Sequence, residues 1–198
     1  GRGGPTNREE GARLLASSAK LGKAAAAYNL GLLYLEGQIF PQDVKRAAEL
    51  FRQAANAGNP EAQYALATLY KEGRGVEKNV VEAAKLMRAA AMVDNLDAEV
   101  EYAIALYNGT GTPKDVPTAI ALLNRAARQN SPIAQNRLAR ILIDGLGVSA
   151  DKVQGFKWHL IAKTAGNGDP DLDAQFAQLP PLEKAKAEAL AKKWFGTK

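Results

Sequence analysis

The sequence contains no cysteine, a single histidine (His159) and no run of about 18 apolar residues that could cross a bilayer. Without cysteine there are no disulfide bonds, thiolate zinc sites or cysteine nucleophiles. One histidine excludes an imidazole pair or a multi-histidine metal site. The sequence therefore predicts no membrane span, no metal site, no bound cofactor and no catalytic residues.

The positive charge is concentrated at the two ends of the chain. The net charge is +5, yet residues 23–182 contain 17 Lys and Arg against 17 Asp and Glu, which leaves +2 before this block and +3 after it. A protein that binds nucleic acid needs a basic stripe along its binding surface. A neutral central block disfavours nucleic acid as the partner.

What the chain does have is an internal repeat with a period of 36 residues. The period relates Gly37, Gly73, Gly109 and Gly145; Ala26, Ala62, Ala98 and Ala134; and Ala54, Ala90, Ala126 and Ala162. Within one unit the apolar residues recur at helical spacing in two segments, which predicts two amphipathic helices. We therefore predict an all-α fold, a right-handed α-α superhelix (solenoid) of four 36-residue helix hairpins.

Residues with short polar side chains recur where each helix should begin. Such side chains accept hydrogen bonds from the free N–H groups of a first helical turn. Those expected before the second helices are Asp43, Asn79, Asp115 and Asp151, and those expected before the first helices are Asn59, Asn95, Ser131 and Asn167.

The period also divides the chain. Residues 1–6 are interpreted as a flexible linker or cloning remnant, and residues 7–22 as a half-repeat helix. Repeats 1 to 4 are assigned to residues 23–58, 59–94, 95–130 and 131–166, and the C-terminal capping helices to residues 167–198. The last helix should cover the final hairpin with an apolar side made of Leu182, Ala185, Ala189, Leu190 and Trp194.

The second unit carries a family resemblance. Its pattern is Ala62, Leu66, Tyr70, Gly73-Arg74-Gly75-Val76, Ala83-Ala84 and Ala90-Ala91. This pattern resembles the Sel1-like repeat, a relative of the tetratricopeptide repeat, and it recurs from Lys23 to about Gly166. Ala67 stands where the family has glycine, and Ile39 replaces the second glycine of the first loop. The helix from Leu182 to Trp194 is similar to the closing helix of exported alphaproteobacterial Sel1-like proteins, which implies a periplasmic or exported bacterial protein, with the cytoplasm as the alternative.

Three motifs that resemble chemical sites have structural interpretations. The Gly-x-Gly loops at 73–75, 109–111 and 145–147 follow helices, not strands, so we expect them to end helices rather than hold phosphate. His159 shares a column with Phe51, Met87 and Leu123 and should be packed. The acidic segment 169–173 is interpreted as a helix start.

The related tetratricopeptide fold implies a concave groove lined by exposed positions of the first helices. The predicted groove residues are Tyr28, Leu32, Leu35, Glu61, Tyr64, Thr68, Lys71, Asp97, Val100, Ile104, Tyr107, Asn136, Arg140 and Ile143. The three tyrosines would be aromatic anchors and Arg140 a charged contact for a peptide. The alternative is that the tyrosines only fill seams between helices.

These features favour a non-catalytic protein-protein interaction scaffold that binds a protein or peptide segment in the groove. The chain could instead be an RNA-binding helical-repeat module or the regulatory domain of a larger enzyme.

Overall fold

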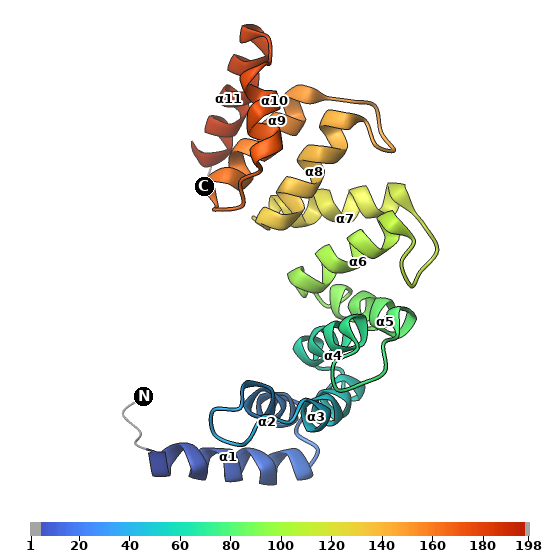
Figure 1. Ribbon diagram of the computed structural model, residues 1–198, viewed down its shortest axis with the longest axis vertical. Helices are drawn as coiled ribbons and strands as arrows, with labels where there is room; N and C mark the ends of the chain where they lie inside the picture. The colour runs from blue at the N-terminus through green and yellow to red at the C-terminus, as the bar shows by residue number, and fades with distance from the viewer. Residues whose placement is uncertain (1–4, 197–198) are drawn as a thin grey trace. The chain divides into compact units, whose positions relative to one another are not determined.

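A computed structural model describes residues 5–196, and every regular element in that range is an α-helix. The helices are α1 (Pro5–Lys20), α2 (Ala24–Glu36), α3 (Val44–Asn56), α4 (Pro60–Glu72), α5 (Val80–Ala91), α6 (Leu96–Asn108), α7 (Val116–Arg128), α8 (Pro132–Asp144), α9 (Lys152–Thr164), α10 (Pro170–Ala177) and α11 (Pro181–Gly196). The all-helical class predicted from the sequence is confirmed. The chain forms two compact units, unit 1 (residues 1–113) and unit 2 (residues 114–198), each described by itself (Figure 1).

Unit 1 is a run of helices in which each packs on the next. The closest associations are the hairpins α2–α3 and α4–α5, while α1 packs on α2, α3 on α4 and α5 on α6. In Figure 1, α2 and α4 lie on the same side of unit 1, opposite α3 and α5. We call the surface made by α2, α4 and α6 the first-helix face.

The core of unit 1 depends on small residues that let helices approach. Phe51 on α3 is fully buried, and its ring lies against Gly31 of α2. A Cβ at Gly31 would lie 2.6 Å from that ring, so α2 and α3 could not pack this closely with any other residue there. The alanine columns, among them Ala47, Ala54 and Ala62, are fully buried around this contact.

Hydrogen bonds confirm seven of the eight expected N-caps. Asp43 accepts from the N–H of Arg46 at 2.9 Å, and Asn59 accepts from the N–H of Ala62 at 2.7 Å. The same pattern holds at Asn79, Asp115, Asp151, Asn95 and Ser131. The expectation for Asn167 was wrong. Helix α10 starts later, with Asp169 as its N-cap, and the side chain of Asn167 instead donates to the carbonyl of Pro132 at 2.9 Å.

The Gly-x-Gly loops end the first helices as expected. Gly37, Gly73, Gly109 and Gly145 are left-handed C-caps. The second glycine of the loop makes a close contact that was not predicted from the sequence. Gly75 has φ +69°, and a Cβ there would lie 2.6 Å from the carbonyl oxygen of Val44 in the preceding hairpin.

The contact made by the second glycine recurs at the same register. A Cβ at Gly111 would collide with the backbone of Val80, and one at Gly147 with the side chain of Val116. Each of these loops therefore rests on the first turn of the previous second helix. Ile39, at this position in the first loop, is not among the residues with positive φ, so that loop takes a different path.

A second left-handed column follows the second helices. Its members are Gly22, Gly58, Asp94, Asn130 and Gly166, with φ of 78°, 82°, 62°, 68° and 84°. Asp94 and Asn130 are the only non-glycine residues with positive φ in the described chain. Asparagine and aspartate tolerate this conformation better than other L-residues, although less well than glycine.

Unit 2 contains α7 to α11. Helices α8 and α9 form its closest hairpin, α7 packs on α8, and α11 packs on α9. The rings of Trp158 on α9 and Trp194 on α11 meet edge to face with centroids 5.2 Å apart. His159 is fully buried, so the prediction that it is packed is confirmed.

Two predictions at the ends of the chain differ from the structure. Of the predicted apolar side of α11, Leu182, Ala185 and Ala189 are exposed. Ala187 and Ala191, one turn apart, are the residues buried there, because the side of α11 that includes Trp194 is rotated toward α9. At the other end, α1 begins at Pro5 and so takes in the last two residues of the predicted linker; residues 1–4 lie outside the described chain. Proline is well suited to a first helical position.

Candidate partner-binding surface

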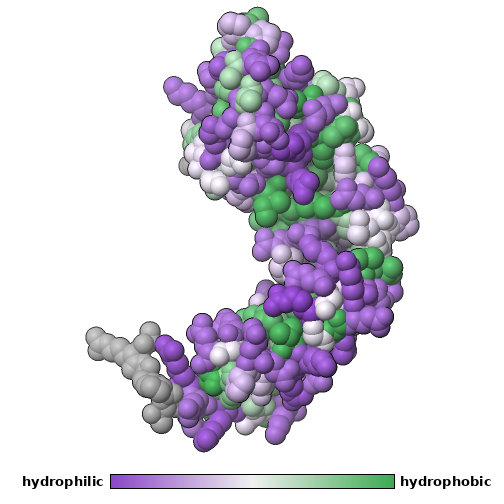
Figure 2. Space-filling view, in the orientation of Figure 1, coloured by the Kyte–Doolittle hydropathy of each residue, from purple (hydrophilic) through white to green (hydrophobic). Residues whose placement is uncertain are grey.

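The first-helix face of unit 1 carries the predicted groove residues of repeats 1 to 3. Tyr28, Leu32 and Leu35 lie on α2, Glu61, Tyr64, Thr68 and Lys71 on α4, and Asp97, Ile104 and Tyr107 on α6. All are half-buried or exposed. Val100 was expected on this face, but only 3% of it is exposed. The side of unit 1 seen in Figure 2 is largely hydrophilic, with separate hydrophobic patches.

Tyr28 both fills a seam and reaches the surface. Its ring lies 5.7 Å from that of Phe51, tilted by 39°, so one side of it belongs to the core. Burial raises the pKa of Tyr28, and the nearby negative charge of Glu61 on α4 raises it further. The phenol of α2 therefore lies within the electrostatic influence of a carboxylate contributed by the next first helix.

Tyr64 repeats this arrangement one unit later. Burial raises its pKa most, the charges of Asp97 and Glu101 on α6 add to the rise, and a hydrogen bond with Thr68 opposes it. Tyr28 with Glu61 and Tyr64 with Asp97 are thus two tyrosine–carboxylate pairs on consecutive repeats, with each tyrosine on one first helix and its carboxylate on the next.

Between α4, α5 and α6 lies a small hollow of about 190 Å³. Its apolar wall includes Ala83 and Met87 of α5 and Ile104 of α6. At its edge, the Nζ of Lys71 forms a 2.8 Å ion pair with Glu101. Lys71 is therefore partly neutralised within the protein, and the hollow offers room for a small apolar side chain.

In unit 2 the predicted groove residues of repeat 4 are already bound to the protein itself. Arg140 on α8 lies 2.6 Å (Nη2) and 2.7 Å (Nε) from the carboxylate of Asp169, and Asn136 donates to the same oxygen at 3.4 Å. Asp171 is 3.6 Å from Arg140. Ile143, also predicted to line the groove, is buried and belongs to the core.

Asp169 is an ionised acid in a nearly buried position. Burial raises its pKa, but hydrogen bonds from the backbone of Leu172 and from Asn136 and Arg140, together with the charge of Arg140, outweigh this and leave the pKa lowered. Sequence analysis missed this pair because residues 29 apart lie beyond any single helix. The signal available was the 36-residue period, which makes the segments that carry Arg140 and Asp169 neighbours in the stack.

A second polar cluster in unit 2 surrounds Asp173 of α10. Its Oδ1 is 2.8 Å from His159 Nε2 and 2.8 Å from Lys163 Nζ. The hydrogen bonds from Lys163 and then His159 lower the pKa of Asp173. The cluster connects α9 to the short helix α10. Because His159 is fully buried, this arrangement fits a structural role better than proton transfer to a substrate.

Two glutamines that the sequence did not point to, the half-buried Gln63 and the buried Gln135, join hairpins to one another. Gln63 donates to the carbonyl of Ala55 at 3.4 Å, and Gln135 donates to that of Ala127 at 3.0 Å. The two bonds are equivalent by the period, and each is a second hydrogen bond to a carbonyl at the end of a second helix that also accepts a backbone N–H.

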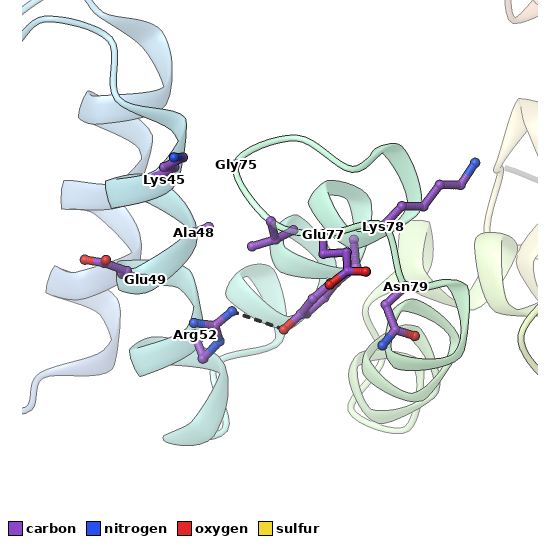
Figure 3. Close-up of a pocket in the computed structure, with 10 residues that line it drawn as sticks. Lys45, Ala48, Glu49, Arg52, Gly75, Glu77, Lys78 and Asn79 are labelled. Atoms are coloured by element: carbon purple, nitrogen blue, oxygen red, sulfur yellow. Dashed lines mark hydrogen bonds between the residues drawn. The ribbon is translucent and has the colours of Figure 1, made fainter.

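A larger hollow of about 540 Å³ lies between α3 and the loop after α4 (Figure 3). Lys45, Glu49 and Arg52 line it from α3, and Glu77 faces them from the loop. Arg52 donates to the hydroxyl of Tyr70 at 3.1 Å. Positive and negative groups alternate around it, so it favours neither an anion nor a cation.

Across residues 5–196 there is no group of three His, Asp or Glu side chains placed to hold a metal ion. None of the helices in this range has the length and apolar character to cross a bilayer.

Stacked helix hairpins, capped at a fixed period and joined by glycine loops, define an α-helical repeat protein. Matches to the Sel1 repeat family cover residues 1–23, 24–59, 60–95, 96–131 and 132–167. The chain therefore belongs to the Sel1 repeat family. Sel1-repeat proteins are generally protein-interaction scaffolds, and the fold is typically non-catalytic.

Solved structures share this fold. A Sel1 repeat protein from Oxalobacter formigenes is 25% identical, with a TM-score of 0.77 over 92% of this chain and 77% of that one. The protective antigen c5321 of uropathogenic Escherichia coli, which displays an SLR fold, is 26% identical, with a TM-score of 0.62 over 93% of this chain; this chain spans 48% of its length. Helicobacter pylori cysteine rich protein B is 16% identical, with a TM-score of 0.52 over 68% of this chain and 96% of that one. A comparison with curated proteins gave no significant match.

Proposed function

We propose that this protein is a binding scaffold that takes a peptide segment of a partner protein on its first-helix face. The observation that carries the proposal is the presence of half-buried tyrosines on successive first helices, Tyr28 on α2, Tyr64 on α4 and Tyr107 on α6. Aromatic side chains held by packing on one side and accessible on the other are typical anchors of protein interfaces.

The surrounding residues suit an extended or helical segment. Leu32 and Leu35 supply apolar area near Tyr28, and Thr68 supplies a hydroxyl beside Tyr64. The hollow beside Lys71 and Glu101 gives a partner side chain a place to insert. On unit 2, taken by itself, we propose Asn136 and Arg140 of α8 as a separate contact surface, where the Arg140 side chain is 43% exposed although it is paired.

The test starts from peptides selected on the wild-type protein from a random 12-residue display library. Affinities are then measured for Tyr64→Ala and for Tyr64→Phe. Loss of an aromatic anchor should weaken binding by about 30-fold, equivalent to about 2 kcal/mol, with helicity by circular dichroism unchanged. Tyr64→Phe separates the ring from its hydroxyl.

The matched control combines Lys85→Ala with Arg88→Ala on the exposed side of α5. This pair should leave affinity unchanged. If selected peptides bind the Tyr64→Ala variant as tightly as the wild type, the first-helix face is not the binding site.

We further propose that the protein is periplasmic or otherwise exported by a bacterium. The support is the resemblance of α11 to the closing helix of exported Sel1-like proteins. Fractionation of the native cells, followed by immunoblotting with a cytoplasmic marker, tests this. Recovery of the protein only with that marker would refute export.

A further inference from the structure

In unit 2, the cation of Arg140 pairs with the carboxylate of Asp169. The carboxylate of Asp169 is reached by Arg140, 29 residues earlier, and by Asn136, 33 residues earlier. Only 7% of the Asp169 side chain is exposed. Both donors come from α8, so a first helix places two side chains against an acid that follows it by nearly one period.

The same two offsets recur twice in unit 1. Glu61 follows Leu32 by 29 residues and Tyr28 by 33; Asp97 follows Thr68 by 29 and Tyr64 by 33. Glu61 and Asp97 each act electrostatically on the tyrosine of their own pair. Unit 1 therefore has the carboxylate of this arrangement without the arginine.

The two carboxylates have no cationic partner within residues 5–196. Glu61 accepts a 2.9 Å hydrogen bond from Asn59, and neither Glu61 nor Asp97 forms an ion pair there. Glu101 differs, because Lys71 already neutralises it. The backbone context also differs from that of Asp169, which is an N-cap, whereas Glu61 and Asp97 lie in the first turns of α4 and α6.

We propose that Tyr28 with Glu61 and Tyr64 with Asp97 are two equivalent subsites for arginine or lysine side chains, so that the partner segment is basic. This inference rests on the proposed function and names its ligand class. The partner's guanidinium or ammonium would take the place that the guanidinium of Arg140 takes beside Asp169.

Each part of a subsite has a role in holding a cation. The carboxylate supplies a charge-assisted hydrogen bond, which is stronger than a neutral one. The tyrosine ring adds a cation–π surface. Next to these groups, Leu32 or Thr68 can contact the methylene stem of the bound residue. Because the subsites lie on consecutive repeats, one segment with two basic residues can occupy both.

The direct test uses fluorescein-labelled peptides of alanine, serine and glycine with two arginines separated by one to six residues, measured by fluorescence anisotropy. Matched peptides carry citrulline, the neutral isostere, or glutamate. We expect at least one arginine spacing to bind, and citrulline to weaken it by about tenfold or more. Glu61→Gln combined with Asp97→Asn should cause a similar loss.

The charge-matched control is Glu49→Gln combined with Glu77→Gln, which removes two exposed carboxylates that lie away from the first-helix face. It should retain wild-type affinity at 150 mM salt. An equal loss in the control, or equal binding of arginine and citrulline peptides, would overturn the proposal.

A gain-of-contact variant tests the register itself. Thr68→Arg places an arginine 29 residues before Asp97, as Arg140 is placed before Asp169. This variant should raise the Tm and weaken binding of the arginine peptide, and adding Asp97→Asn should remove the rise in Tm. If Thr68→Arg changed the Tm equally with and without Asp97→Asn, a contact like that of Arg140 with Asp169 would not form at this position of unit 1.

The two proposals fail in different ways. If neutral or acidic peptides bind and Tyr28→Ala or Tyr64→Ala abolishes that binding, the binding surface stands and the basic ligand class is wrong. If peptides of all three classes bind independently of both tyrosines, or none binds, the proposed function fails as well.

Discussion

Arg140 and Asp169 form a two-atom contact, at 2.6 and 2.7 Å, that holds the start of α10 against α8. The acid is 7% exposed and the base 43% exposed. The acid also caps α10 by accepting from the N–H groups of Asp171 and Leu172. Asp169 therefore both caps α10 and forms an ion pair with Arg140.

The first prediction concerns Asp169→Asn. Asparagine keeps the cap but loses the ionic attraction, and because solvent reaches Arg140 the expected loss in the free energy of unfolding is about 1–2 kcal/mol at pH 7. Urea titration followed by circular dichroism measures it. Asp171→Asn, whose side chain is 80% exposed, is the control and should change stability little.

The difference between wild type and Asp169→Asn should depend on pH. Hydrogen bonds and Arg140 hold the pKa of Asp169 below its ordinary value in the folded state. Its stabilising contribution is therefore fully present above the unfolded pKa of about 3.9 and is lost as pH falls through the lower, folded pKa. The difference in stability between the two proteins should therefore shrink progressively as the pH falls below about 3.9. A difference that stays constant from pH 7 into the acid range would contradict this account.

The second prediction compares two glycines with similar φ. Gly58 (φ +82°) faces open space, whereas a Cβ at Gly75 (φ +69°) would meet the carbonyl of Val44. Gly58→Ala should cost about 1 kcal/mol from backbone strain alone, and Gly75→Ala about 2 kcal/mol or more because the hairpins must also separate. Equal losses in thermal unfolding would mean that the Val44 contact contributes nothing.

The third prediction is a stabilisation. Asp94 is exposed and has φ +62°, at a position where Gly22, Gly58 and Gly166 occur. Asp94→Gly should raise the free energy of unfolding by about 0.5–1 kcal/mol because it relieves left-handed strain without removing packing. Asp94→Ala, which retains the Cβ, should not stabilise, and calorimetry distinguishes the two.

The fourth prediction tests how α11 covers α9. Ala187 is fully buried, whereas Ala189 on the same helix is exposed. Ala187→Glu should destabilise unit 2 by about 3 kcal/mol because it buries an unpaired charge, and Ala189→Glu should be nearly neutral. If Ala189→Glu were the damaging change, the side of α11 originally predicted to be apolar would be the packed one.

The sequence predicted features that repeat at a fixed spacing. The caps at Asp43 and Asn59 and the left-handed glycine at Gly73 could be inferred because each depends on a few neighbouring residues. The burial of His159 could be predicted because it occupies the same repeat position as Phe51, Met87 and Leu123. Local chemistry and periodicity were enough for these because neither requires knowledge of how the hairpins pack.

Features that break the period or depend on packing could not be predicted. Asn167 occupies a cap column, but α10 starts two residues later and Asp169 takes over. The buried side of α11 was misplaced because Ala187 and Ala185 are equally apolar, and only contact with α9 distinguishes them. Val100 and Ile143 were expected to line the groove but are core residues. The position of a residue in the repeat does not show whether an adjacent helix covers its side chain.

The contact between Gly75 and Val44 joins members of two columns of the repeat, as do those between Gly111 and Val80 and between Gly147 and Val116. An in-frame duplication or deletion of one whole period would therefore recreate the same junction on both sides of the change. Such a gene could lengthen or shorten by unequal recombination without inventing a new interface, whereas an indel of any other length would leave a loop glycine facing the wrong partner.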